Sequence, residues 1–155
     1  MDFFEVLRRR HSVRAYLAKK VEKEKLERIL EAIDSAPSAG NLKAYKVVVI
    51  EDERKRKELA DAAFSQQFVA QAPVVLVFFA DTQKSASHYG IRGEQLYALQ
   101  DATIACCFAM LACFALGLAN CWVGAFDDSK VKEICGIREQ ALRPVAILPI
   151  GYADE

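Results

Sequence analysis

The sequence predicts a single α+β domain, because its predicted strands and helices mix along the chain without the strict alternation of a doubly wound parallel sheet. Its length of 155 residues is typical of one domain with its own hydrophobic core. Short β-branched apolar segments and one long run of apolar helix-forming residues supply the surface to bury. We therefore expect one domain over residues 1–155.

The N-terminal part of the chain predicts two helices separated by a loop. Asp2 is a suitable N-cap for a first helix that runs to about Arg10, and a loop follows through Lys20. A second helix, ending at Ser35, is predicted by four apolar residues at helical spacing: Leu26, Ile29, Leu30 and Ile33.

Two strands and a helix are predicted next. Pro37 ends the second helix and opens the loop Pro37-Ser38-Ala39-Gly40-Asn41, which is rich in turn-forming residues. The β-branched segment Tyr45–Ile50 predicts a strand, and a charged helix is expected from about Glu53 to Phe64. Pro73 introduces a second strand, Val74–Ala80, whose continuous apolar character indicates that both of its faces are covered.

Residues 81–93 are polar and contain two glycines, so they predict a mobile loop. His88 and Tyr89 lie in this segment. They are candidates for the wall of a substrate entrance, and the alternative is that they are incidental exposed side chains of a loop.

The longest predicted element is a helix from Gly93 to Leu118. Between Ala102 and Ala119 its only ordinary polar side chain is Thr103, and this length approaches that of a membrane span. The alanine, cysteine and glycine content makes the hydrophobicity modest, however, and Asn120–Gly124 follows directly as a strand and loop. We therefore expect a buried central helix and no membrane partner. Its small side chains also permit close helix approach at a subunit interface.

A short helix and a final strand complete the predicted elements. The helix runs from Asp127 to Cys135, with Gly136 as its C-cap. The strand covers Pro144–Ile150.

Charge and cysteine content exclude several classes of protein. Lys plus Arg and Asp plus Glu both number 21, so no global field favours nucleic acid or an anionic membrane. The five cysteines are odd in number and lack a C-x-x-C pair, which favours buried thiols in a reducing compartment over disulfides or zinc. The start of the chain has no signal-peptide pattern, so we expect a cytoplasmic location. The spacing of the cysteines and histidines does not fit a metal site, so we expect no metal. The cysteines are Cys106, Cys107, Cys113, Cys121 and Cys135.

A basic cluster near the start is the strongest local signal. Four arginines occur within seven residues in the segment Arg8–Arg14. Guanidinium groups suit phosphate oxygens, and the hydroxyl of Ser12 and the ring of His11 add directional hydrogen bonds. The segment therefore predicts an anion site, most simply for a phosphate. The alternative is a solvated basic helix end.

Familiar catalytic motifs are missing. The chain has no G-x-G-x-x-G, no P-loop and no G-x-S-x-G nucleophile elbow. Ser12 and His11 have no evident third member of a triad, and Asp127-Asp128 fits a helix start. We expect no catalytic side chain, so any chemistry would belong to a cofactor.

Five short segments occur in order along nearly the whole chain. They are Arg10-His11-Ser12-Val13-Arg14, Pro37-Ser38-Ala39-Gly40-Asn41, Gln67–Pro73, Trp122-Val123-Gly124-Ala125-Phe126 and Ile150-Gly151-Tyr152. In their order and spacing they resemble the nitroreductase family of FMN-dependent oxidoreductases. The resemblance implies a mostly antiparallel central sheet flanked by helices, with the long apolar helix at the interface of a homodimer.

The resemblance also implies a role for each site residue. Arg10, Ser12 and Arg14 would hold the FMN phosphate, with His11 near the ribityl chain or the pyrimidine end of the ring. Trp122 lies in the loop beside the flavin, where Gly124 and Ala125 would direct backbone N–H groups at the ring. Gln67 would contact the pyrimidine or ribityl part. The residues that would reach the flavin of the partner subunit are Pro37, Ser38, Ala39 and Asn41.

The implied activity is a ping-pong reaction in which NADH or NADPH reduces FMN and a small-molecule oxidant then takes two electrons. Nitroaromatics, quinones or flavins would be the oxidants. The alternatives are a flavin-binding carrier or sensor with little turnover, and a specialised FMN-dependent dehydrogenase or dehalogenase.

The chain departs from the family pattern in three places. Lys43 stands where the family often has glutamine, and Ala44-Tyr45 replaces its common Pro-Trp. The sequence ends at Glu155, where many relatives continue with further basic phosphate ligands. We therefore expect the N-terminal arginines to supply most of the charge that neutralises the phosphate.

Overall fold

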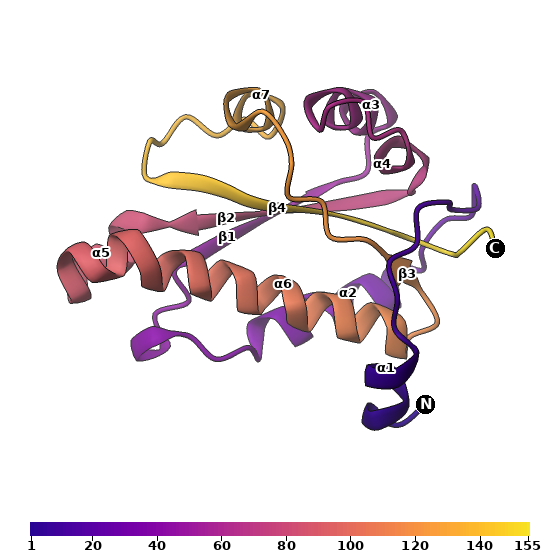
Figure 1. Ribbon diagram of the computed structural model, residues 1–155, viewed down its shortest axis with the longest axis horizontal. Helices are drawn as coiled ribbons and strands as arrows, with labels where there is room; N and C mark the ends of the chain where they lie inside the picture. The colour runs from indigo at the N-terminus through magenta and orange to yellow at the C-terminus, as the bar shows by residue number, and fades with distance from the viewer.

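The computed structural model describes residues 1–155 and consists of an antiparallel sheet with helices on both faces (Figure 1). The strand order is β1-β2-β4-β3, and every neighbouring pair is antiparallel. The strands are β1 (Tyr45–Ile50), β2 (Val74–Asp81), β3 (Ala119–Asn120) and β4 (Leu142–Gly151). The predicted α+β class and antiparallel sheet are confirmed, and each predicted strand is present.

The helices form a layer on either side of this sheet. In Figure 1, α3, α4 and α7 cover one face, and α2 and α6 cover the other. The helices are α1 (Phe3–Arg9), α2 (Lys23–Asp34), α3 (Glu53–Ala62), α4 (Phe68–Gln71), α5 (Thr82–Arg92), α6 (Ala98–Ala115) and α7 (Asp128–Ile134), with a 3₁₀ turn η1 (Ala39–Asn41) and a π turn η2 (Gly93–Tyr97). Asp2 caps α1 as predicted, since its carboxylate accepts a hydrogen bond from the Glu5 N–H at 3.0 Å.

Strand β2 is buried on both faces, as its continuous apolar sequence predicts. Successive side chains of a strand point to opposite faces. Val74, Leu76 and Phe78 therefore join the core formed with α2 and α6. Val75, Val77 and Phe79 join the core formed with α3 and α7. This one strand thus links the two hydrophobic layers.

Helix α6 packs on the sheet through a face of small side chains. Its buried apolar residues recur at helical spacing and are Ala98, Ala102, Ala105, Cys106, Ala109 and Cys113. By length and composition, the helical segment Thr82–Ala115 is long and apolar enough to cross a membrane. Of an apolar stretch of 18 residues within it, however, 39% is buried inside this fold. The predicted central helix is therefore present, and its opposite apolar face, with Leu111 and Ala112, is only partly covered within one chain.

Two predictions about local structure are corrected. Residues 81–93 are helical, not a loop: Asp81 caps α5 by accepting from the Lys84 N–H at 3.1 Å, and Gly90 takes a positive φ of 59° at a kink. The polar composition reflects the exposure of this helix. Helix α6 ends at Ala115, before the predicted Leu118, because Gly117 has a left-handed φ of 80°.

The cysteines are all free, and their burial differs from site to site. Cys106, Cys113 and Cys121 are buried, as predicted. Cys107 is exposed, since it lies on the side of α6 that faces away from the sheet, and Cys135 is partly exposed. The expectation of buried thiols is thus met at three positions and is wrong at Cys107.

Candidate functional site

The arginine-rich segment is anchored as an extended strip beside β3 and the C-terminal residues. The Val13 N–H donates to the Asn120 carbonyl at 3.0 Å, and the Leu17 N–H donates to the Tyr152 carbonyl at 2.9 Å. The Val13 side chain is buried, whereas Ser12 and Arg14 on either side of it are exposed. Burial of Val13 therefore turns its two neighbours outward, where they are accessible to a ligand.

The arginines of this segment have no ion-pair partner. The structure contains six ion pairs, and Arg8, Arg9, Arg10 and Arg14 take part in none of them. Arg8 and Arg9 lie in the last turn of α1, where a cation is favourable to the helix dipole. Arg10 is the C-cap of α1 and Arg14 lies beyond the helix, so the solvated-helix-end interpretation does not cover Arg14. Their charge is available to an external anion.

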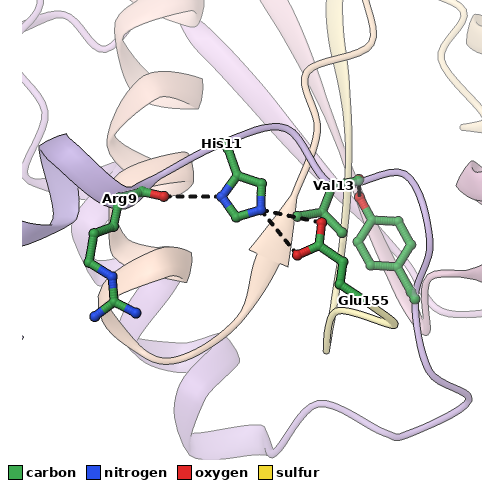
Figure 2. A network of polar contacts seen from close by, with 5 residues as sticks. Arg9, His11, Val13 and Glu155 are labelled. Carbon is green, nitrogen blue, oxygen red and sulfur yellow. Dashed lines mark hydrogen bonds and ion pairs between the residues drawn. The ribbon is translucent and has the colours of Figure 1, made fainter.

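His11 is held between two acceptors of its own chain (Figure 2). Its Nδ1 lies 3.0 Å from the Arg9 carbonyl oxygen, and its Nε2 lies 3.2 Å from Glu155 Oε2. Only a protonated ring donates to both. The Arg9 carbonyl, followed by the Glu155 carboxylate, therefore raises the pKa of His11 above 6.5. The ring also meets Phe114 of α6 edge-on, with centroids 6.1 Å apart.

The loop after β3 presents unpaired backbone donors. Val123 exchanges hydrogen bonds with Ile147 at 2.9 Å in both directions, which fixes the start of the loop. Gly124 and Ala125 follow; both are exposed, and neither backbone N–H has a hydrogen-bond acceptor. The Trp122 indole lies against Gly124, where an added Cβ would sit 3.4 Å from its Nε1. This loop therefore offers two free donors beside an aromatic ring.

Gln66, the neighbour of the predicted site residue Gln67, contacts this loop. Its Nε2 donates to the Ala63 carbonyl at 2.9 Å and to the Ala125 carbonyl at 3.3 Å. Gln67 is exposed, and its side chain makes no hydrogen bond. Phe68 packs on the cluster of Val13 and its neighbours. The segments 10–14, 66–68 and 122–125 thus form one group around β3.

The second predicted group, the loop Pro37–Asn41, is held by bonds of a different kind. The Lys43 N–H donates to Ser38 Oγ at 2.9 Å, and the Ala39 N–H donates to Asp101 Oδ1 at 3.1 Å. The Tyr89 ring lies against Gly40, where its hydroxyl occupies the space of a Cβ. Tyr89, a candidate for the wall of a substrate entrance, therefore packs on the predicted site loop.

The two groups lie at opposite ends of α6. Asp101, in the first turn of α6, binds the loop Pro37–Asn41, whereas Phe114, in the last turn, contacts His11. At 1.5 Å per residue these helix positions are about 20 Å apart. Figure 1 likewise shows α5 and α1 at opposite ends of α6. One chain alone does not bring the two groups together.

Comparison with known proteins agrees with the sequence motifs. The model of the family described as "Nitroreductase family" matches residues 7–152. The chain belongs to the nitroreductase family. It is 32% identical to an NADH dehydrogenase of Thermus thermophilus, over 95% of this chain and 84% of the relative. It is also 32% identical to the FMN reductase [NAD(P)H] of Bacillus subtilis, over 91% of this chain and 61% of that protein.

Solved structures of the family share this fold. An FMN-dependent nitroreductase of Clostridium difficile superposes with a TM-score of 0.86 at 29% identity, over 98% of this chain and 88% of that one. A nitroreductase family protein of Clostridium novyi superposes with a TM-score of 0.90 at 28% identity, over 100% of this chain and 87% of that one. The predicted family and fold are confirmed. At the level of the family, so is the predicted class, FMN-dependent NAD(P)H oxidoreductases.

Sequence reasoning missed Asp101, although one signal pointed to it. Asp101 is the only charged residue between Glu94 and Asp127. A single carboxylate in such an apolar segment rarely lies in a core without a partner.

The pairing of His11 with Glu155 predicts a measurable pKa. The imidazole should titrate above 6.5 in the wild type, and Glu155→Gln should lower its pKa because it removes the negative charge beside Nε2. Because the folded-state pKa is raised, this pairing favours the folded state at low pH, and its contribution is lost as the pH rises through that value. NMR titration of the ring protons measures both. A His11 pKa that Glu155→Gln leaves unchanged would contradict the contact.

Proposed function

We propose that residues 1–155 form a single FMN-binding domain that uses NADH or NADPH to reduce nitroaromatics, quinones or flavins by a ping-pong mechanism. The observation that carries this proposal is the group around β3. It combines the unpaired guanidinium groups of segment 10–14 with the unpaired backbone N–H groups of segment 124–125. A phosphate and an electron-accepting ring need these two kinds of donor.

The arginine strip fits the phosphate end of FMN. Arg10, Ser12 and Arg14 would donate to the phosphate oxygens, and the absence of a carboxylate partner for either arginine leaves their charge for this purpose. His11, held between the Arg9 carbonyl and the Glu155 carboxylate, would lie near the ribityl chain or the pyrimidine end.

The loop after β3 fits the ring. When bound, FMN accepts a hydride from NAD(P)H and passes two electrons to an oxidant. The N–H groups of Gly124 and Ala125 would stabilise the negative charge that reduction places on the ring, because they are fixed before the reaction. Trp122 beside them would exclude water from one side, and Gln67 with its neighbour Gln66 would border the pyrimidine end. We assign no acid or base to a side chain.

A homodimer would complete the site. The loop residues Pro37, Ser38, Ala39 and Asn41 lie too far from the arginine strip to share its ligand within one chain, so those of the partner subunit would reach the ring. An apolar groove on the free face of α6 and α1 supports this assembly. Its lining residues are Met1, Phe3, Val6, Ala32, Phe108, Leu111, Ala112 and Ala115. Phe3 is 59% exposed in the single chain, and an exposed aromatic residue in this groove supports a proposed contact with another copy. We also propose a cytoplasmic location.

The first test is an absorbance spectrum of the purified protein before and after anaerobic NADH or NADPH. Flavin bands that bleach with one nucleotide and return with a quinone or nitroaromatic support the proposal and identify the donor.

Arg14→Ala should weaken FMN binding about 10- to 100-fold, because it removes a charge-assisted bond to phosphate. Lys46→Ala, an exposed cation on β1, is the matched control. Unchanged FMN affinity in Arg14→Ala contradicts the phosphate role, and flavin that no nucleotide reduces indicates a carrier.

The dimer is tested at the groove of α6. Ala112→Glu should convert the dimer to monomer in light scattering, because it places a charge in an apolar interface. Ala112 is the suitable position, since the neighbouring Cys113 is buried against the sheet of its own chain. Val49→Glu, on the exposed side of β1, should leave the mass unchanged. An Ala112→Glu protein that remains dimeric removes this face from the interface.

A further inference from the structure

Asp101 is a buried carboxylate with an incomplete set of partners. It lies in the first turn of α6 and is 2% exposed. Oδ1 accepts the Ala39 N–H at 3.1 Å, while Oδ2 is buried and has no donor. Ala98 and Ala102, on either side of it in α6, belong to a cluster of buried alanines with Ala44 and Ala80. An apolar environment of this kind does not solvate a charge.

Stability of the fold does not account for this residue. Burial of a carboxylate costs free energy, and one hydrogen bond from a neutral N–H offsets only part of that cost. Even the replacement of a buried ion pair by apolar residues of similar volume is often neutral or stabilising, so a buried charge is weak evidence of a role in stability. The carboxylate of Asp101 is therefore better explained by what it holds in place.

It holds the loop Pro37–Asn41. The other hydrogen bonds of residues 37–41 are made within residues 38–43, so the bond from Ala39 to Asp101 is the one that ties this loop to the core helix. The loop needs such a tie because Asn41 has a φ of 56° and Lys43 a φ of 50°. Asparagine adopts left-handed backbone more readily than most residues, but at a lysine this backbone is strained and persists only where the surroundings fix it.

We propose that Asp101 is a positioning residue of the FMN site, which fixes the loop Pro37–Asn41 in the conformation that meets the flavin of the partner subunit. This inference rests on the proposed function. Asp101 does not touch the cofactor; it acts through the Ala39 N–H. A buried and incompletely hydrogen-bonded carboxyl group in the first turn of α6 thus serves to define the loop.

Three variants test the proposal. Asp101→Leu removes the acceptor and keeps the branching of the side chain, with methyl groups in place of the two oxygens, and Asp101→Asn keeps an oxygen that accepts from Ala39. Ser85→Ala is the matched control, because Ser85 is also buried with an unpaired polar atom but lies on α5. For each, FMN affinity is measured by fluorescence titration, apoprotein stability by urea unfolding, and loop order by amide hydrogen exchange of residues 38–42.

The expected result separates positioning from folding. Asp101→Leu should weaken FMN binding at least about tenfold and speed exchange of the Ala39 amide, while its urea midpoint stays the same or rises. Asp101→Asn should bind FMN within about threefold of wild type, and Ser85→Ala should bind as wild type.

Several results would overturn the proposal. One is that Asp101→Leu binds FMN with wild-type affinity. Another is that Asp101→Leu and Asp101→Asn lose the same amount of FMN affinity. A loss accompanied by a lower urea midpoint and unchanged loop exchange would assign Asp101 to folding alone. If the wild type itself binds no FMN, the proposed function fails. Loop exchange in Asp101→Leu then still decides whether Asp101 orders the loop.

Discussion

The packing of α6 on the sheet is the constraint on which the rest of the structure depends. Alanine and cysteine side chains allow this helix to lie close to β2 and β4, and its length then fixes the separation between the arginine strip and the loop Pro37–Asn41. The same packing directs the opposite apolar face away from the sheet. One helix therefore both separates the two parts of the site and provides the surface through which a second copy would join them.

Electrostatics at the two ends of α6 follow different rules. At the C-terminal end, Arg10 and Arg14 are solvated and unpaired, so their charge costs little and is available to an anion. At the N-terminal end, Asp101 is buried with a single donor, so its charge is costly. Exposed charge suits the recruitment of a ligand, whereas buried charge suits the fixing of a loop. Gly124 and Ala125 are a third case, in which backbone dipoles replace charged side chains.

The sequence predicted most of the fold because its periodic signals are strong. The apolar run of β2 and the cap at Asp2 appear where predicted. Helix α5 was mistaken for a loop because its exposed polar residues lack a clear apolar period and Gly90 interrupts it. Local patterns cannot report contacts between distant segments, so the bond from Ala39 to Asp101 and the contact of Gln66 with Ala125 were missed. For the same reason, the motifs alone did not show that the arginine strip and the loop Pro37–Asn41 lie at opposite ends of α6.

In the homodimer that we propose, each FMN site takes its arginine strip from one subunit and its loop from the other. Subunit mixing tests this arrangement: Arg14→Ala and Ala39→Glu chains, each expected to bind FMN weakly as a homodimer, are unfolded together, refolded and isolated as the mixed dimer. A shared site predicts one intact site, so the mixed dimer should bind one FMN per two chains with wild-type affinity. A mixed dimer that binds no FMN tightly would contradict the shared site, because both parts would then belong to the same chain.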